Sequence, residues 1–389
     1  MNNEIDNMQG ETGMLYSRLK AYSASGAYPM HMPGHKRNVE LLPRGLPYDI
    51  DITEIHGFDD LHNACGVLQE TTRLAMELYG SNKAFLLING STVGNLAAIG
   101  AHTGRGDKIL ITGNPHRSIR NAVGLFGLDP LYIESEADEM SGIGCSVCPS
   151  TVETALEKNP DVRLVVVTSP TYEGVISDIS SISHIVHARN IPLLVDSAHG
   201  AHLGFSPGFP DSAVRSGADI VVMSLHKTLP ALTQCSLLHV CGNRANEKEV
   251  SRMLSVLQTS SPSYVLMASI DCCLRLLVSD KDRLFSEYER NLNQFSEEIK
   301  PLQCLSVLYH DRVPLRSNFY AFDPGKIVIV TKKTALSGVA LANILRAEFK
   351  IELELACTDY AIAMTSICDS AEGLSRLAGA LCAIDRLAT

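Results

Sequence analysis

A lysine and an aspartate, each at the end of an apolar run, are the residues of this sequence best suited to chemistry. Lys227 follows the run 219–223 (DIVVM), and Asp196 closes the run 192–195 (PLLV). Such short runs, rich in branched apolar side chains, predict buried strands. Open α/β sheets bind ligands at the carboxyl ends of their strands. A lysine that can form a Schiff base and an acid that can pair with a pyridinium nitrogen are what pyridoxal phosphate requires.

A segment of small and hydroxylated residues, 89–95 (NGSTVGN), follows a predicted strand over 84–88. It opens a predicted apolar helix over 93–101, and the first turn of a helix presents free backbone N–H groups to an anion. Ser91 and Thr92 are therefore candidate phosphate ligands, although a hydroxyl at this place is also an ordinary helix cap. Together with the lysine and the aspartate, this loop favours a phosphate-bearing cofactor over the structural role that each feature has alone.

Alternating strand and helix patterns surround these residues. Predicted strands lie at 84–88, 108–112, 131–133, 164–168, 193–195, 220–223 and 237–240. The predicted helices between them include 116–126 and 179–188. This alternation predicts an α/β fold with a mostly parallel sheet flanked by helices.

The pattern changes after about residue 245. Helical stretches over 248–277 and 285–299 precede a β-rich section and further short elements up to a last helix from 371. These features predict a smaller α+β domain at the C-terminus. We therefore divide the chain into an N-terminal arm and pocket-lining segment over 1–62, a large cofactor-binding domain over 63–280 and a small domain over 281–389.

Bulk properties narrow the function further. The chain has 389 residues, of which 45% are hydrophobic, so it can bury a large core. A net charge of −10 argues against a nucleic-acid partner, and no apolar run is long enough to span a membrane. Eleven cysteines and a polar N-terminus predict a cytoplasmic protein. Neither the single C-x-x-C at 145–148 nor the pair His184 and His187 has enough partners for a metal site, so we predict none.

The motifs of this chain resemble those of the Orn/Lys/Arg decarboxylases, a family of pyridoxal-phosphate enzymes of fold type I with an aspartate-aminotransferase-like architecture. The resemblance runs almost end to end. It is carried by HMPGHK (31–36), DITEIHGFDDLH (51–62), NGSTVGN (89–95), NPHRS (114–118), SPTYEGVISDI (169–179), VDSAHGAH (195–202), SLHKTLPALTQ (224–234) and TSSPSY (259–264). The first two motifs are the most specific to the decarboxylases.

The resemblance implies roles for individual residues. Lys227 would hold the cofactor covalently, Asp196 would keep its pyridine nitrogen protonated, and His116 would stack on its ring. Lys227 or His226 would return a proton to Cα after CO₂ has left. The cofactor contacts implied are Gly90, Ser91, Thr92, His116, Asp196, His199, Ser224, His226 and Lys227.

The same resemblance implies a substrate and an assembly. The expected reaction is decarboxylation of a basic amino acid: arginine, lysine or ornithine. Because a cationic side chain out of water needs a carboxylate, candidate substrate ligands are Glu54, Asp59, Asp60 and Glu354. Residues 259–261 would reach the phosphate of a neighbouring subunit, which implies a homodimer or larger homo-oligomer with shared sites.

Two alternatives stay open. Another fold-type-I enzyme, an aminotransferase or an amino-acid lyase, would share Asp196 and Lys227, and an aminotransferase could use Arg316 or Arg346 for the substrate carboxylate. A cofactor-binding paralogue without decarboxylase activity is the second alternative. Long members of the family carry a further C-terminal domain, whereas this sequence stops at Thr389.

Overall fold

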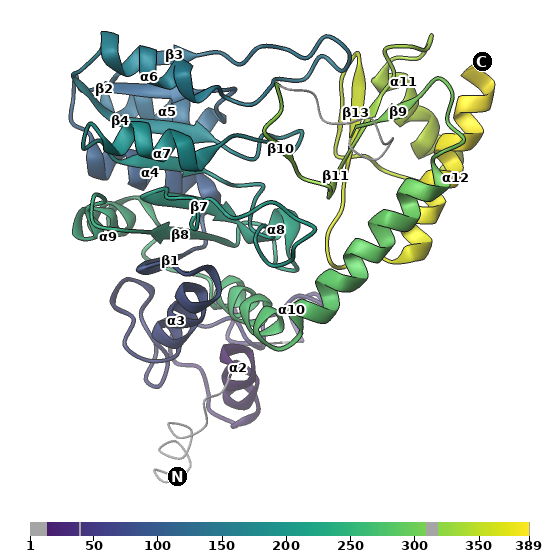
Figure 1. Cartoon of the computed structure of the whole chain (residues 1–389). Coiled ribbons are helices and arrows are strands. Elements are labelled where there is room, and N and C mark those ends of the chain that lie inside the picture. The colour runs from purple at the N-terminus through teal and green to yellow at the C-terminus, as the bar shows by residue number, and fades with distance from the viewer. Residues whose placement is uncertain (1–13, 39, 309–317, 389) are drawn as a thin grey trace.

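A computed structural model describes residues 14–38, 40–308 and 318–388. Within these residues a seven-stranded sheet has the order β1-β8-β7-β6-β4-β2-β3 (Figure 1). Its strands are β1 (Lys83–Leu87), β2 (Lys108–Thr112), β3 (Asp129–Ile133), β4 (Val162–Thr168), β6 (Leu193–Asp196), β7 (Ile220–Ser224) and β8 (Ser236–Val240). The five strands β7, β6, β4, β2 and β3 run parallel to one another, and β8 is antiparallel to both β7 and β1.

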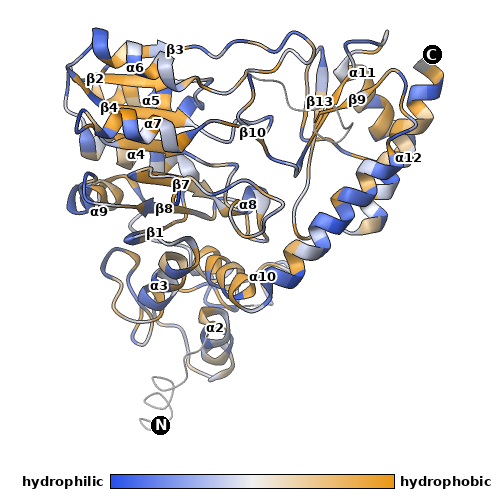
Figure 2. Ribbon diagram, viewed as in Figure 1, coloured by the Kyte–Doolittle hydropathy of each residue, from blue (hydrophilic) through white to orange (hydrophobic). Residues whose placement is uncertain are grey.

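Helices cover both faces of this sheet, which explains why its central strands are continuous apolar runs. One face packs against α4 (Gly90–His102), α5 (Arg117–Phe126) and α9 (Glu247–Leu257). The other face packs against α3 (Val67–Tyr79), α6 (Pro149–Lys158), α7 (Ile179–His187) and α10 (Tyr264–Glu298). Hydropathy colouring shows the strands as the most apolar part of the large unit (Figure 2). The predicted α/β architecture is confirmed.

A second, smaller sheet lies at the far end of the molecule. Its order is β12 (Leu355–Ala356), β13 (Tyr360–Met364), β11 (Lys326–Val330) and β9 (Ser306–Val307), and all pairs are antiparallel. The helical elements α11 (Gly338–Ile344), η2 (Leu345–Phe349) and α12 (Ala371–Ala388) accompany it. A separate pair, β10 (Ala321–Phe322) with β5 (Val175–Ile176), joins this unit to the large one.

The long helix α10 connects the two units, and here the predicted helix boundaries are wrong. The stretch 248–277 is broken, because Pro262 lacks a backbone donor and separates α9 from α10. The polar stretch 278–284 was expected to end a helix but continues α10. It is polar because α10 is largely exposed where it crosses between the units (Figure 2).

The predicted division at 280/281 falls inside α10, and we propose that this helix forms part of both units. Figure 1 shows α10 running from beneath the large sheet to α12 beside the small one. Its N-terminal half also holds the N-terminal segment, in which α2 (Leu15–Ala24) precedes the short helix η1 (Leu61–Asn63). There the buried Asp271 carboxylate accepts hydrogen bonds from Leu15 N (2.9 Å) and Thr71 Oγ1 (2.8 Å).

Candidate active site

The lysine and the aspartate singled out from the sequence lie at the same edge of the large sheet. Asp196 is the last residue of β6 and pairs in register with Val222 of the parallel strand β7. Lys227 lies in the four-residue helix α8 (Leu225–Thr228), which follows β7 directly. The negative charge of Asp196 raises the pKa of Lys227, but burial has the larger effect and lowers it. The sheet therefore brings the pair together as predicted.

Asp196 is a buried carboxylate held by two hydrogen bonds. Its side chain accepts hydrogen bonds from Asn95 Nδ2 (2.9 Å) and Ala198 N (3.3 Å). Burial raises its pKa, while Lys227, Asn95 and His116 act in the opposite direction. Among the described residues no cation forms an ion pair with it. A buried acid of this kind fits a protonated pyridine nitrogen, which would supply the missing charge.

Two helix N-termini carry the residues around Asp196. Asn95, in the second turn of α4, also donates to Ser118 Oγ (3.1 Å). His116 is the N-cap of α5, where Nδ1 accepts from Ser118 N (3.2 Å) and contacts Ser118 Oγ (2.8 Å). Partial burial lowers the pKa of His116, so a neutral ring lies beside the acid. Asn95 was not assigned a role from the sequence, although it closes the NGSTVGN motif.

The N-terminus of α4 has the features of a phosphate site. Gly90 begins the helix with φ +73°, and its N-cap Asn89 makes no side-chain capping bond. Ser91 is buried and Thr92 is exposed in this first turn. The helix packs closely on β7, since a Cβ on Gly94 would lie 2.8 Å from Val222 Cγ1.

Two further residues predicted to contact the cofactor lie where β7 ends and α8 begins. Ser224 is fully buried, and its hydroxyl has no hydrogen-bond partner among the described residues. His226 contacts the Cys235 carbonyl through Nδ1 (2.9 Å), and burial lowers its pKa. An unpartnered buried hydroxyl beside free helix N–H groups fits an anionic ligand. The residues present thus fit pyridoxal phosphate.

The small sheet supplies residues that the sequence did not reveal as part of a site. His199 Nε2 is 3.0 Å from Lys227 Nζ, and His199 Nδ1 is 2.8 Å from Lys326 Nζ. Lys326 is the first residue of β11 and is only 1% exposed. Burial lowers the pKa of Lys326 to about 8. Nothing local distinguishes Lys326 from an ordinary strand residue, because its partner is 127 positions away in sequence.

A tyrosine and a glutamate complete this side. The ring of Tyr172 lies 4.7 Å from that of His199, centroid to centroid, at 57°. Its hydroxyl donates a hydrogen bond to Glu354, and burial together with this carboxylate raises the pKa of Tyr172. Glu354 is exposed, yet its charge raises the pKa of both Lys227 and Lys326. It is the one predicted substrate ligand with such an influence on Lys227.

This arrangement has counterparts in known proteins. Residues 14–370 match the family described as Orn/Lys/Arg decarboxylase, major domain. The chain belongs to this family. Its members are pyridoxal-phosphate-dependent amino-acid decarboxylases, so the predicted cofactor and enzyme class follow from membership.

Individual relatives show how far the likeness extends. The chain is 38% identical to the uncharacterized protein YaaO of Bacillus subtilis (strain 168) over 351 residues, which cover 87% of this chain and 71% of that protein. It is 32% identical to the arginine decarboxylase of the same organism over 373 residues, covering 94% and 76%. The solved lysine decarboxylase of Francisella novicida superposes with a TM-score of 0.80 at 18% identity, covering 96% of this chain and 60% of that one. At this identity the structural likeness confirms the predicted fold type I.

The carboxylates of the second decarboxylase motif have local partners. Asp59 accepts hydrogen bonds from the backbone N–H groups of Cys65 (3.0 Å), Gly66 (2.7 Å) and Leu68 (2.8 Å), which cap α3. Asp60 accepts from His62 N (2.8 Å) and Asn63 Nδ2 (2.9 Å). Glu54 is exposed and accepts from Thr53 Oγ1 (2.6 Å). Within this chain the structure gives these acids hydrogen-bonding roles away from Lys227.

The segment expected to reach a neighbouring subunit begins beside the phosphate loop of its own chain. Thr259 N donates to Asn89 Oδ1 (3.2 Å), and His62 Nε2 lies 3.1 Å from the Thr259 carbonyl. Ser260 and Ser261 are exposed. The segment therefore links the second decarboxylase motif to the start of α4 and leaves two hydroxyls on the surface.

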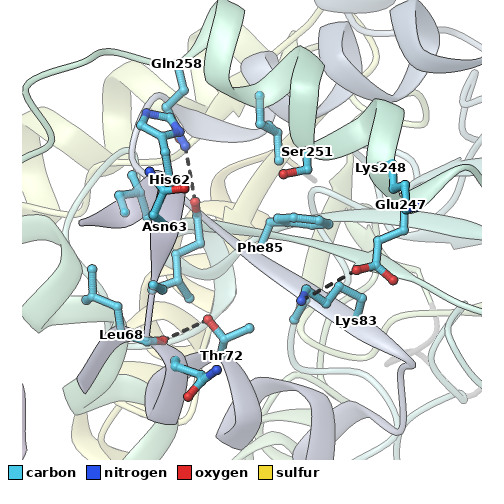
Figure 3. Close-up of a pocket in the computed structure, with 16 residues that line it drawn as sticks. His62, Asn63, Leu68, Thr72, Lys83, Phe85, Glu247, Lys248, Ser251 and Gln258 are labelled. Atoms are coloured by element: carbon cyan, nitrogen blue, oxygen red, sulfur yellow. Dashed lines mark hydrogen bonds and ion pairs between the residues drawn. The ribbon is translucent and has the colours of Figure 1, made fainter. Parts of the chain in front are cut away.

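Two cavities lie near these residues. One of about 420 Å³ lies between α3, β1 and α9, where Lys83 and Glu247 form an ion pair of 3.5 Å (Figure 3). It contains none of the predicted cofactor contacts. Another, of about 660 Å³, is lined by Pro115, Tyr172 and Glu173 among others. It contains none of the predicted cofactor contacts either, but Pro115 precedes His116 in sequence and Tyr172 is the partner of Glu354.

Nowhere in the described part of the chain do three or more His, Cys, Asp or Glu side chains gather as metal ligands would. Among the described helices, none combines the length and the hydropathy needed to cross a lipid bilayer.

Proposed function

We propose that this chain removes CO₂ from a basic amino acid with the help of pyridoxal phosphate. The observation that carries the proposal is the pair that follows two neighbouring strands. Lys227 is a lysine whose pKa burial lowers, and Asp196 is a buried acid that forms no ion pair among the described residues. The family to which the chain belongs supports the reaction class. Relatives named arginine decarboxylase and lysine decarboxylase support a basic substrate.

The roles divide among the described residues. Pyridoxal phosphate, when bound, accepts the electrons that a departing CO₂ leaves at Cα. Asp196 would hold the proton on the ring nitrogen of the cofactor, and Lys227 would attach the cofactor covalently. His116 would pack its neutral ring against the cofactor. Ser91, Thr92 and Ser224 would bind the phosphate together with Gly90 and His226, with the Gly90 N–H itself donating to the Gln234 carbonyl (3.0 Å).

Proton return to Cα needs a donor near the reacting carbon. Lys227 and His226 are the candidates. His226 has one ring nitrogen engaged with the Cys235 carbonyl, so it could act only through Nε2. Lys227 is an alternative because burial lowers its pKa toward the range where general acid–base groups work best.

A cationic side chain would find a carboxylate in the Tyr172–Glu354 pair. Glu354 is held by the Tyr172 hydroxyl, and Glu173 next to it accepts from Tyr360 OH (3.0 Å). Glu173 lines the 660 Å³ cavity, and Glu354 is bonded to Tyr172, which also lines it. Two such acids favour an ammonium or guanidinium over a neutral side chain. Glu354 is therefore our first choice for substrate recognition.

The aminotransferase alternative loses one of its two arginines. Arg346 is exposed and forms a bidentate pair with Glu352, with Nε to Oε2 at 2.7 Å. Arg316 lies outside the described residues. The alternative of a cofactor-binding paralogue without activity makes its own prediction, namely cofactor capture without turnover.

We also propose a cytoplasmic homodimer in which residues 259–261 complete the site of the second subunit. The exposed Ser260 and Ser261 support this, because their hydroxyls have space to meet another chain. Sedimentation of the purified enzyme should show a dimer or a larger species. A fully active monomer would contradict the shared site.

One experiment separates the functions. Purified chain loaded with cofactor is supplied with carboxyl-labelled arginine, lysine, ornithine and the neutral analogue norleucine. We expect labelled CO₂ from at least one basic substrate and much less from norleucine. Keto acid without CO₂ would indicate an aminotransferase, and cofactor capture without either product would indicate the inactive paralogue.

A further inference from the structure

Lys326 is a buried lysine that none of the roles proposed above uses. It begins β11 in the small sheet, and its side chain passes over Gly174 of the large unit. A Cβ on Gly174 would lie 2.7 Å from the Lys326 Cβ and Cγ atoms, and Gly174 has φ +101°. The stem is thus packed against Gly174 and buried, which limits the positions that the ammonium can reach. Burying a lysine in this way is costly, so its contacts merit explanation.

Two lysines contact one imidazole. His199 has Lys326 Nζ 2.8 Å from Nδ1 and Lys227 Nζ 3.0 Å from Nε2. A neutral imidazole carries one N–H and one lone pair. If one lysine donates to the ring as an ammonium, the other ring nitrogen must bear the hydrogen. The second lysine can then complete the chain only as a neutral amine.

The other protonation states are disfavoured. A charged imidazole would face two lysines in a buried place, and burial together with Lys326 and Lys227 lowers the pKa of His199 well below its usual value. Two ammoniums would leave one of them facing an N–H of the ring. Burial lowers the pKa of both lysines as well. The state with a neutral ring and one ammonium satisfies every hydrogen bond.

We propose that Lys326 is a positioning residue that shares a single proton with Lys227 through His199 and thereby sets when Lys227 is a free amine. The proton balance is closed. Lys227 Nζ gives a proton to His199 Nε2 while Nδ1–H passes to Lys326 Nζ, so the net charge is unchanged and no other reactant is needed. The use of this device rests on the proposed function, because only a neutral lysine can attack the cofactor's aldehyde.

Other charged and titratable groups face this chain of contacts from several elements. They are Asp196, Glu173, Glu354, Asp323, His116, His202 and Tyr172. Asp323 is itself held by His202 Nε2 (3.0 Å) and raises the pKa of Lys326. None of these groups is altered in the variants below, so they do not change the sign of the expected shifts.

The test uses the full-length chain without cofactor. Trace labelling with an amine-specific acylating reagent across a pH series, read by mass spectrometry at Lys227, reports the fraction of that lysine that is neutral. In the parent protein we expect two steps, since coupled groups titrate as a pair. Lys326→Met removes the second titrating amine, so Lys227 should titrate in a single step near the upper of the two.

Lys326→Arg gives the opposite expectation. A guanidinium stays charged and can only donate, so it should occupy His199 Nδ1 permanently and hold Lys227 neutral to lower pH. The midpoints of the methionine and arginine variants should differ by about 1–3 pH units, with methionine higher. Lys332→Met is the matched control, because Lys332 is exposed beyond β11 and contacts only the Glu139 carbonyl among the bonds described. Its curve should equal the parent's.

Equal midpoints in the methionine and arginine variants would overturn the proposal. A second readout protects against a variant that folds poorly: nitrogen NMR of the parent chain with labelled histidine. His199 should stay neutral and change its ratio of Nδ1–H to Nε2–H across the two lysine steps, and a ring fixed in one form throughout would also refute the coupling. Neither readout needs substrate or turnover, so failure of the decarboxylation screen leaves them interpretable.

Discussion

The two units of the molecule reach Lys227 in different ways. The large sheet places Asp196, Asn95 and His116 at strand ends and helix starts, within motifs that are contiguous in sequence. Lys326 and Glu354 approach from the small unit, and they lie about a hundred residues after Lys227 in sequence. The first set offers groups that can hold a cofactor. The second set offers charges that act on the lysine.

Burial acts on both sets, and the sign of its effect depends on the type of group. It raises the pKa of the acid Asp196 and lowers the pKa of the bases His116, His199 and Lys326. In each case it favours the neutral form. A cationic cofactor ring would restore the charge of Asp196, whereas Lys326 lowers the pKa of His199 further. We therefore expect large losses from changes in the first set and shifts of pH or substrate dependence from the second.

The largest effect is expected at Lys227. Lys227→Ala removes the only described lysine that contacts His199 Nε2 beside Asp196. CO₂ release should fall by about 10²–10⁴-fold, the range for losing a positioned acid–base group. Borohydride should no longer fix the cofactor to the protein, while circular dichroism should be unchanged. Turnover within tenfold of the parent's would mean that another residue does this work.

The next largest effect is expected at Asp196. Asp196→Asn keeps a hydrogen-bond acceptor for Asn95 but removes the charge. A hydrogen bond to a charged group contributes about 1.5–3 kcal/mol, which corresponds to a loss of roughly tenfold to a hundredfold in kcat. Undiminished kcat would show that the acid does not support the cofactor ring.

The same variant has a pH signature in stability. Burial raises the folded-state pKa of Asp196 above 3.8, so the folded protein favours the protonated acid. Stability contributed by this group is therefore lost as the pH rises from 3.8 through the folded-state value. Without cofactor, the melting temperature of Asp196→Asn relative to the parent should rise over this range and then level off. A difference that shrinks with pH would indicate a cationic partner for Asp196.

How much could be read from the sequence differs between the two units. The strands of the large sheet were predicted within a few residues, because buried parallel strands are continuous apolar runs. Asp196 and Lys227 follow from the same pattern. Lys326 and Tyr172 could not be found in this way, since their roles arise from contacts between distant segments. Asp59 shows what the motif alone does not reveal: an acid predicted as a substrate ligand also accepts the backbone N–H groups at the start of α3.

A smaller effect is expected at Glu354. Glu354→Gln removes the charge that the Tyr172 hydroxyl holds. An exposed ion pair is weak, so KM for a basic substrate should rise only about twofold to fivefold, with KM for norleucine unchanged. The lost charge should also lower the pKa of Lys227, which Glu354 now raises. Tyr172→Phe should reproduce part of the KM change. Equal effects on both substrates would remove Glu354 from recognition.

The smallest effect on catalysis is expected at Asp59, although the variant should be less stable. Asp59 is 7% exposed and accepts three backbone N–H groups at the start of α3. An amide has one oxygen and two N–H groups, so Asp59→Asn cannot accept all of these bonds and would point donors at donors. Loss of a helix cap costs about 0.5–2 kcal/mol, which should appear as a lower melting temperature. Per folded molecule, kcat and KM should match the parent. Asp60→Asn is the matched comparison on the adjacent residue. Asp59→Asn could instead raise KM for the basic substrate alone and leave stability intact. The N-terminal motif would then share recognition of the cationic substrate with Glu354, and the charges that act at the site would no longer come from the small unit only.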